Sequence, residues 1–174
     1  SSNNTPKCLL KIGERSLLQR SMDALIKNGI TEFVIVTGYL HKMIENFVSG
    51  QYGNSIKVTF IHNKVYDSTN NIYSLWLARP EAENEDILLL DSDLLYDPEI
   101  VTRVLANEAK NVLTLIRHEL GEEEMKVVVD KEGSILEISK TCRVEDAAGE
   151  SLGIEKMGKE YTRALYAELE PMMN

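Results

Sequence analysis

Cysteine and long apolar runs are both scarce in this sequence. Its only two cysteines, Cys8 and Cys142, lie far apart and form no CxxC pair. A disulfide framework or a zinc site uses more thiols at closer spacing, so two reduced thiols are expected. No apolar run approaches the ~20 residues that a membrane helix requires, and the first residues lack the pattern of a signal peptide. These features predict a cytoplasmic protein with no membrane partner.

Positive charge is also in short supply. The 19 Lys and Arg residues are outnumbered by 28 Asp and Glu residues, which gives a formal net charge of −9. Nucleic-acid binding needs clustered Lys and Arg, so no nucleic-acid partner is expected. A small anionic ligand remains compatible, because a few cations and helix N-termini can hold phosphate locally. With 43 % hydrophobic and 27 % charged residues, the 174-residue chain is typical of one globular domain.

The first part of the chain alternates helical and strand-like apolar patterns. Helices are expected at residues 16–28, around 43–48, at 68–78 and at 99–109, and strands at 33–36, 56–61 and 87–90. Strands that are apolar throughout and separated by helices are typical of a parallel sheet covered on both faces. The βαβαβ order therefore predicts a parallel sheet with right-handed crossovers.

The pattern changes after Asn111. Short strands are expected at 112–116, 126–130 and 134–139, with Lys131-Glu132-Gly133 as a hairpin loop, and a last helix at 162–169. We predict an α/β fold, specifically a Rossmann-like three-layer α/β/α mixed sheet. Its N-terminal half is parallel and its C-terminal half is more antiparallel. Residues 1–174 are expected to form a single domain, since no repeat or linker interrupts them.

Three strand ends carry polar residues suited to a ligand site. In an open α/β sheet, ligands bind beyond the carboxyl ends of the strands. Those ends are Thr37-Gly38-Tyr39, His62-Asn63 and Asp91-Ser92-Asp93. Two carboxylates one residue apart lie on the same side of an extended chain, and Mg²⁺ is bound by one or two carboxylates plus phosphate oxygens. The pattern favours a magnesium site at Asp91 and Asp93; the alternative is a turn cap and a solvated aspartate.

Several segments resemble the sugar-phosphate and choline-phosphate nucleotidyltransferases. The stretch Thr5-Pro6-Lys7-Cys8-Leu9-Leu10-Lys11-Ile12-Gly13 is similar to the end of that family's signature. Further matching segments follow in the family's order at residues 34–39, 70–75, 91–93, 124–127, 138–140 and 149–154. The elements at 70–75 and 124–127 look closest to the bacterial choline-phosphate cytidylyltransferase-like branch. The resemblance implies a nucleotide-binding half at 1–110 and an acceptor-binding half at 111–174, in a fold of the nucleotide-diphospho-sugar transferase type.

The resemblance also implies roles on the nucleotide side. Lys7 matches the signature lysine that contacts phosphate. Asp93 matches the family's magnesium aspartate, with Asp91 as an auxiliary ligand. Asn70 and Asn71 fall where the nucleobase and ribose are read, a task suited to amide donors and acceptors. Asn71 has an equally good alternative as a helix cap.

On the acceptor side, Lys140 matches a lysine that holds the acceptor's phosphate, with Lys126 assisting it. Glu150 and Gly153 match the acceptor side of the pocket, where a carboxylate meets a cationic amine. The alternative for Glu150 is that it only orients Lys126 or Lys140. The residues expected to carry the reaction are Lys7, Asp93 and Lys140.

Aromatic and glycine residues near these elements have two interpretations each. Gly38 and Tyr39 let the chain pass close to the nucleotide, or only start a turn. Tyr73 and Trp76 suit an aromatic cage for a quaternary ammonium, but their helical spacing is more typical of core residues. The core interpretation is favoured.

The resemblance implies a Mg²⁺-dependent enzyme that uses a nucleoside triphosphate, with CTP favoured. The expected acceptor is a small phosphorylated or phosphonylated molecule such as phosphocholine or aminoethylphosphonate. Alternatives are a sugar 1-phosphate nucleotidyltransferase, a glycosyltransferase with an Asp-x-Asp motif, and a non-catalytic nucleotide-binding regulatory subunit.

The family's glycine-rich segment and its second metal aspartate find no counterpart in this sequence. The chain starts at Ser1 without a methionine, so we expect it to be cut at both ends and to be poorly active alone. A homo-oligomer or a fused partner domain is compatible with the sequence.

Overall fold

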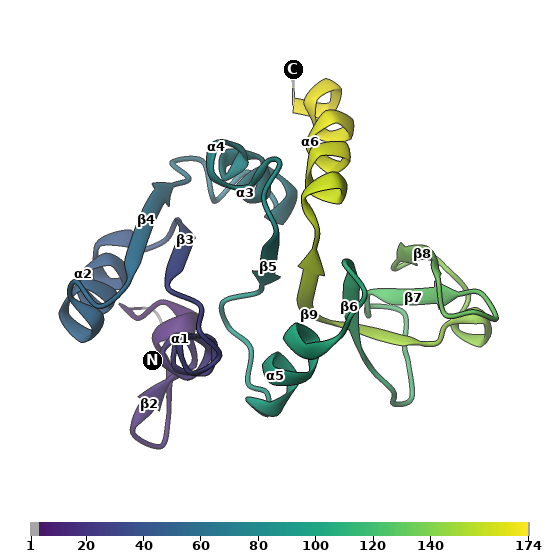
Figure 1. Ribbon diagram of the computed structural model, residues 1–174, viewed down its shortest axis with the longest axis horizontal. Coiled ribbons are helices and arrows are strands. Elements are labelled where there is room, and N and C mark those ends of the chain that lie inside the picture. Colours follow the sequence, from purple (N-terminus) through teal and green to yellow (C-terminus); the bar gives the residue numbers. More distant parts are fainter. Residues whose placement is uncertain (1–3, 174) are drawn as a thin grey trace.

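The computed structural model describes residues 4–173, and the expectations placed on the ends at Ser1 and Asn174 fall outside that range. Two regions are apparent in Figure 1: helices packed on a parallel strand pair near the N-terminus, and an antiparallel sheet built from the later strands. Among the described residues, no helix has the length and apolar content needed to span a bilayer.

The N-terminal region begins with a short turn and hairpin and then forms two helix–strand pairs. These elements are η2 (Lys7–Leu9), β1 (Lys11–Ile12), β2 (Arg15–Ser16), α1 (Leu17–Lys27), β3 (Glu32–Thr37), α2 (His41–Tyr52) and β4 (Lys57–His62). The predicted cap Ser16 is confirmed, because its side chain accepts from the Gln19 N–H at 3.1 Å. β3 and β4 pair in parallel, from Glu32 opposite Lys57 to Thr37 opposite His62.

The core of this region is formed by α1, α2 and the inner face of the strand pair. Its buried members are Cys8, Leu18, Met22, Ile44 and Val48. Phe33, Ile35, Val58 and Phe60 of the strands pack against them. The apolar spacing that predicted the helices is therefore the spacing that fills this core.

A helical connection leads from β4 into the second sheet. It consists of α3 (Asn71–Leu77) and α4 (Arg79–Ala82), which precede β5 (Ile87–Leu90) and α5 (Glu99–Ala106). The helix predicted from residue 68 begins at Asn71, because the Asn70 side chain caps it by accepting from the Tyr73 N–H at 3.2 Å. The helix predicted over 99–109 ends at Ala106.

The C-terminal region is a five-stranded sheet arranged around one strand. Its members are β5, β6 (Val112–Ile116), β7 (Lys126–Val129), β8 (Ile135–Ser139) and β9 (Gly149–Met157). β9 pairs antiparallel with β5, β6 and β7. No strand was predicted at 149–157, because the sequence Gly-Glu-Ser-Leu-Gly-Ile-Glu-Lys-Met contains two glycines and no continuous apolar run. The organising strand of the sheet is thus the one with the weakest sequence pattern.

One predicted pairing is wrong. β5 was expected to extend the parallel sheet of β3 and β4, but within residues 4–173 its recorded partner is β9, in antiparallel orientation. The run Ile87–Leu90 is apolar on both faces, which indicates burial but does not specify a partner. The α/β class is confirmed, with a parallel N-terminal pair and an antiparallel C-terminal sheet.

The last helix, α6 (Lys159–Met173), returns the chain to the helical connection. Tyr166 of α6 is fully buried and its hydroxyl donates to the Leu75 carbonyl at 2.9 Å. Trp76 packs against the buried cluster of Ala82, Tyr166 and Leu169, and the Arg79 guanidinium lies 4.8 Å from the centre of the Trp76 ring. The core interpretation of Trp76 is therefore confirmed.

Candidate active site

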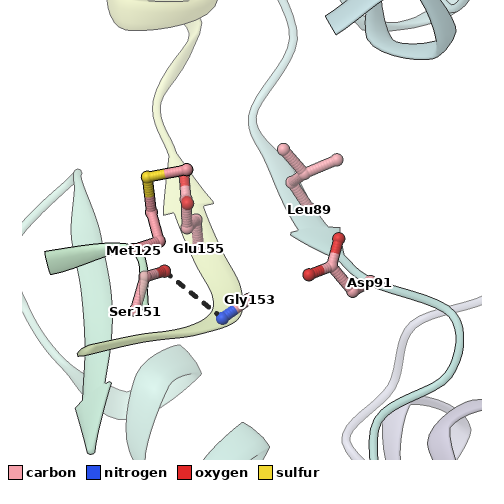
Figure 2. Close-up of a pocket in the computed structure, with 6 residues that line it drawn as sticks. All are labelled: Leu89, Asp91, Met125, Ser151, Gly153 and Glu155. Carbon is pink, nitrogen blue, oxygen red and sulfur yellow. Dashed lines mark hydrogen bonds between the residues drawn. The ribbon is translucent and has the colours of Figure 1, made fainter. Parts of the chain in front are cut away.

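Residues of β5, of β9 and of the segments next to β5 and β7 line a cavity of about 200 Å³. Its lining residues are Leu89, Asp91, Met125, Ser151, Gly153 and Glu155. Figure 2 shows Leu89 and Asp91 on the β5 side facing the others across the pocket. The predicted strand-end carboxylate Asp91 and the predicted acceptor residue Gly153 thus lie in one place, although 62 positions of sequence separate them.

Gly153 makes the close approach of the two strands possible. The Asp91 N–H donates to the Gly153 carbonyl at 3.0 Å, and the Gly153 φ of +85° lies in the left-handed region that favours glycine. A Cβ at this position would overlap the Asp91 carboxylate. The pairing of β6 with β9 also shifts register between Leu113 and Leu115, opposite this point. Irregularities of this kind are common beside active sites because they re-aim side chains.

Three carboxylates influence one another at this edge of the sheet. Partial burial and the negative charge of Asp93 raise the pKa of Asp91. Burial and the charge of Asp91 raise the pKa of Glu155. Both shifts mean that the charged forms of Asp91 and Glu155 are destabilised while no cation is bound beside them. A cationic ligand or a metal ion would therefore be stabilised here.

The signature segment has an electrostatic link to Asp93. Burial, and to a lesser extent the charge of Asp93, raises the pKa of the Cys8 thiol to about 11, so Asp93 lies within electrostatic reach of Cys8. Lys7, the preceding residue, is exposed on η2. The predicted phosphate lysine is thus the sequence neighbour of a residue that feels the charge of the predicted metal aspartate.

Gly38 and Tyr39, which follow β3, lie next to Tyr66. A Cβ at Gly38 would lie 2.6 Å from the Tyr66 Cβ, so the absent side chain makes room for Tyr66. The rings of Tyr39 and Tyr66 are 6.3 Å apart.

The cap of α3 is Asn70 rather than Asn71. Asn71 is the first residue of the helix and its side chain is exposed. The alternative that Asn71 is the cap is therefore wrong.

The predicted acceptor residues other than Gly153 lie outside the cavity lining. Lys126 is 2 % exposed and its ammonium donates to three main-chain carbonyls. The exposed Lys140 ammonium lies 3.5 Å from a Glu123 carboxylate oxygen. The Glu150 carboxylate lies 2.7 Å from His118 Nε2, so the recorded partner of Glu150 is His118 rather than either lysine.

Glu155 and Met125 line the pocket but were not predicted as site residues, and His118 is the unpredicted partner of Glu150. His118 Nδ1 faces the Glu119 carbonyl and Nε2 faces the Glu150 carboxylate, each at 2.7 Å. Both ring nitrogens therefore donate, which is the protonated form, and the Glu150 hydrogen bond is the main cause of the raised His118 pKa. Glu155 shares a strand face with Gly153, a relation visible from the sequence only once β9 is recognised as a strand.

The remaining histidines also form a contact that the sequence did not indicate. The rings of His41 and His62 stack with centroids 3.8 Å apart. The His41 Nδ1 lies 3.0 Å from a Glu45 carboxylate oxygen. Within residues 4–173, no group of three His, Cys, Asp or Glu side chains is placed to hold a metal ion by itself.

The fold is that of the nucleotidyltransferases. The structure superposes on CTP:phosphocholine cytidylyltransferase from Streptococcus pneumoniae with a TM-score of 0.75 and 21 % identity, over 99 % of this chain and 70 % of that one. Residues 3–139 match the family described as a domain of unknown function, DUF6564, and the chain belongs to that family.

Curated relatives point to the same class. The chain is 30 % identical over 105 residues to a CMP-5'-(3-aminopropyl)phosphonate synthase of Streptomyces rubellomurinus, covering 60 % of this chain and 16 % of the relative. It is 30 % identical over 93 residues to a choline-phosphate cytidylyltransferase of Streptococcus pneumoniae, covering 53 % and 38 %. The matched stretches thus span less than half of these relatives' lengths. The resemblance to nucleotidyltransferases near the choline-phosphate branch is confirmed.

Proposed function

We propose that the protein is a Mg²⁺-dependent cytidylyltransferase that transfers CMP from CTP to a small phosphorylated or phosphonylated acceptor, with release of pyrophosphate. The observation that carries this proposal is the position of Asp91, which lines the pocket beside Gly153 and whose pKa is raised in part by the charge of Asp93. The names of the relatives, which include cytidylyltransferases acting on choline phosphate and a phosphonate, support the choice of CTP and of the acceptor class.

The residues present fit a magnesium ion. Mg²⁺ uses one or two carboxylates and completes its shell with phosphate oxygens and water. Asp93 and Asp91 are suited to hold it, because burial and, after it, the charge of Asp93 already raise the pKa of Asp91. A bound Mg²⁺ would neutralise charge on the triphosphate oxygens.

The remaining steps need positioning rather than strong acid–base chemistry. Lys7 is exposed, and its neighbour Cys8 lies within electrostatic reach of Asp93, which supports a role for the Lys7 ammonium in contacting triphosphate oxygens. The acceptor's phosphate or phosphonate is already an anion near neutral pH, so its oxygen attacks the α-phosphorus without a strong general base. Orientation and charge neutralisation then supply the rate enhancement.

The pocket supports an acceptor with a small cationic group. Leu89 and Met125 give it apolar walls, whereas Asp91 and Glu155 make it negatively charged. An ammonium group gains from both features, but a neutral sugar ring gains little from the charge. Glu155, and not Glu150, is then the carboxylate that meets the cationic amine of the acceptor.

The test is a panel of four nucleoside triphosphates against phosphocholine, 2-aminoethylphosphonate and glucose 1-phosphate, with pyrophosphate release as the readout. It is run on the natural full-length protein with Mg²⁺ and repeated after chelation. We expect the highest kcat/KM with CTP and one of the two amine-bearing acceptors, and no turnover without the metal. A preference for glucose 1-phosphate would leave only the general nucleotidyltransferase assignment, and no release with any pair would favour a non-catalytic nucleotide-binding subunit.

A further inference from the structure

Lys126 is a buried cation without a carboxylate partner among its recorded bonds. Its residue is 2 % exposed at the start of β7, a position where a lysine is rarely found unless it is compensated. The ammonium donates to the carbonyls of Lys140 at 2.7 Å, Glu122 at 3.3 Å and Glu124 at 3.3 Å. An ammonium has three N–H donors, so these carbonyls satisfy it and leave no donor for a phosphate.

The three carbonyls belong to two segments that are separate in sequence. Glu122 and Glu124 lie in the loop that connects β6 with β7, and Lys140 directly follows β8. Lys126 is therefore the one described side chain that ties this loop to the end of β8 through main-chain acceptors on both.

Both tied segments carry residues of the proposed acceptor site. Met125 adjoins Lys126 and lines the pocket, and its carbonyl accepts from the Ser151 N–H at 2.9 Å. Ser151 lines the pocket as well. Lys140, the predicted phosphate lysine, has its main chain held by the shortest of the three Lys126 bonds. Displacement of the Lys126 ammonium would thus move the Met125 wall and the base of the Lys140 side chain together.

We propose that Lys126 is a positioning residue for the acceptor: it fixes Met125 and Lys140 through main-chain carbonyls and does not itself bind the acceptor's phosphate. This inference rests on the proposed function. It assigns Lys126 a role different from direct phosphate binding, because a phosphate contact would require the ammonium to give up at least one of its three carbonyl partners. Its effect is expected on acceptor binding and not on CTP binding.

The test compares Lys126→Met with Lys131→Met in the natural full-length protein. Lys131 lies in the exposed hairpin loop between β7 and β8, so the control removes the same charge from the same hairpin without touching a carbonyl. Amide hydrogen exchange without substrates is measured first. We expect faster exchange at residues 118–125 and 140–143 in Lys126→Met only, which is a consequence of the lost tether and does not depend on activity.

Steady-state kinetics with CTP and the preferred acceptor follow. Lys126→Met is expected to raise the acceptor KM by about tenfold, while the CTP KM stays within about twofold and kcat at saturation changes little. Lys126→Arg is expected to fall between the wild type and Lys126→Met, because a planar guanidinium cannot converge on three carbonyls as a compact ammonium does. It also serves if Lys126→Met does not fold.

The outcomes separate the two proposals. Unchanged exchange in Lys126→Met would overturn the tether whatever the activity is. Faster exchange with an unchanged acceptor KM, or with equal rises of both KM values, would overturn the positioning role. Absence of turnover in the wild type would overturn the proposed function and with it the acceptor role, and the exchange data would then judge the tether alone.

Discussion

The two regions of the molecule are stabilised by different kinds of residue. In the N-terminal region, α1 and α2 bury regular apolar faces against the parallel pair β3–β4. In the C-terminal region, three of the four other strands of the sheet pair with β9, which contains two glycines and two glutamates. The edge strand β8 is exposed along nearly its whole length. The first region is therefore a framework made by apolar burial, whereas the second combines buried apolar residues such as Val127 and Ile154 with specific polar contacts.

This difference assigns different tolerances to the two regions. Conservative apolar substitutions in α1 or α2 act on packing and are expected to cost stability without a specific effect on chemistry. Substitutions at polar or glycine positions of the C-terminal sheet act on the geometry of the pocket. The following predictions test this comparison, starting with the largest expected effect.

Asp93→Asn tests whether Asp93, which follows β5, is a ligand of the metal. We expect turnover to fall by about a hundredfold or more, because the amide is a poor Mg²⁺ ligand. The melting temperature should change little, since Asp93 is exposed. Pyrophosphate release and thermal unfolding are the measurements, with Asp97→Asn as the control, because Asn retains the oxygen that accepts from the Glu99 N–H. Full activity of Asp93→Asn in excess Mg²⁺ would refute the assignment.

Gly153→Ala tests the close approach of β9 to β5. We expect a loss of about 2–4 kcal/mol of unfolding free energy, because the new Cβ adds a clash with Asp91 to the cost of a positive φ. Gly133→Ala is the matched control: its φ of +88° is similar but its Cβ would meet open space. The control should lose only about 1 kcal/mol. Equal losses in urea unfolding would show that the contact with Asp91 contributes nothing.

Substitutions of Asn70 and Asn71 distinguish a structural role, the helix cap at Asn70, from a ligand-binding role at Asn71. Asn70→Ala should cost about 1 kcal/mol, because it removes the cap of α3. Asn71→Ala should cost less than about 0.5 kcal/mol, because the residue is exposed. If Asn71 reads the nucleotide, its substitution raises the KM for CTP at unchanged stability. A larger stability loss at Asn71 than at Asn70 would contradict the cap assignment.

The His118–Glu150 pair should make the C-terminal region slightly pH-sensitive, and this is the smallest of the effects. Because the pKa of folded His118 is raised above the ordinary value of 6.5, its contribution is complete below that value and is lost as the pH rises through the folded pKa. We expect the stability difference between wild type and His118→Gln to be larger at about pH 5.5 than at about pH 9. His41→Gln, in the N-terminal region, serves as a comparison. A pH-independent difference for His118 would exclude the charged pair.

The sequence predicted most of the framework and only part of the site. β5 and β6 occupy the predicted residues Ile87–Leu90 and Val112–Ile116, because a continuous apolar run reports burial directly. Asp91 and Gly153 were predicted separately, and the structure places both on the pocket. Glu155 was missed because β9 has no apolar periodicity that would identify it as a strand.

By itself, the sequence determined which segments are buried, where the helices of the N-terminal region lie, and which strand end carries paired carboxylates. These properties depend on residues that are close in sequence, so the spacing of apolar and polar residues along the chain indicates them. Only the tertiary structure decided that β5 pairs with β9, that Glu150 meets His118, and that Lys126 is satisfied by three carbonyls. Each of these contacts joins residues that are distant in sequence or lie in irregular loops. Local patterns carry no record of such partners, because burial can be satisfied by many pairings but only the whole fold selects one.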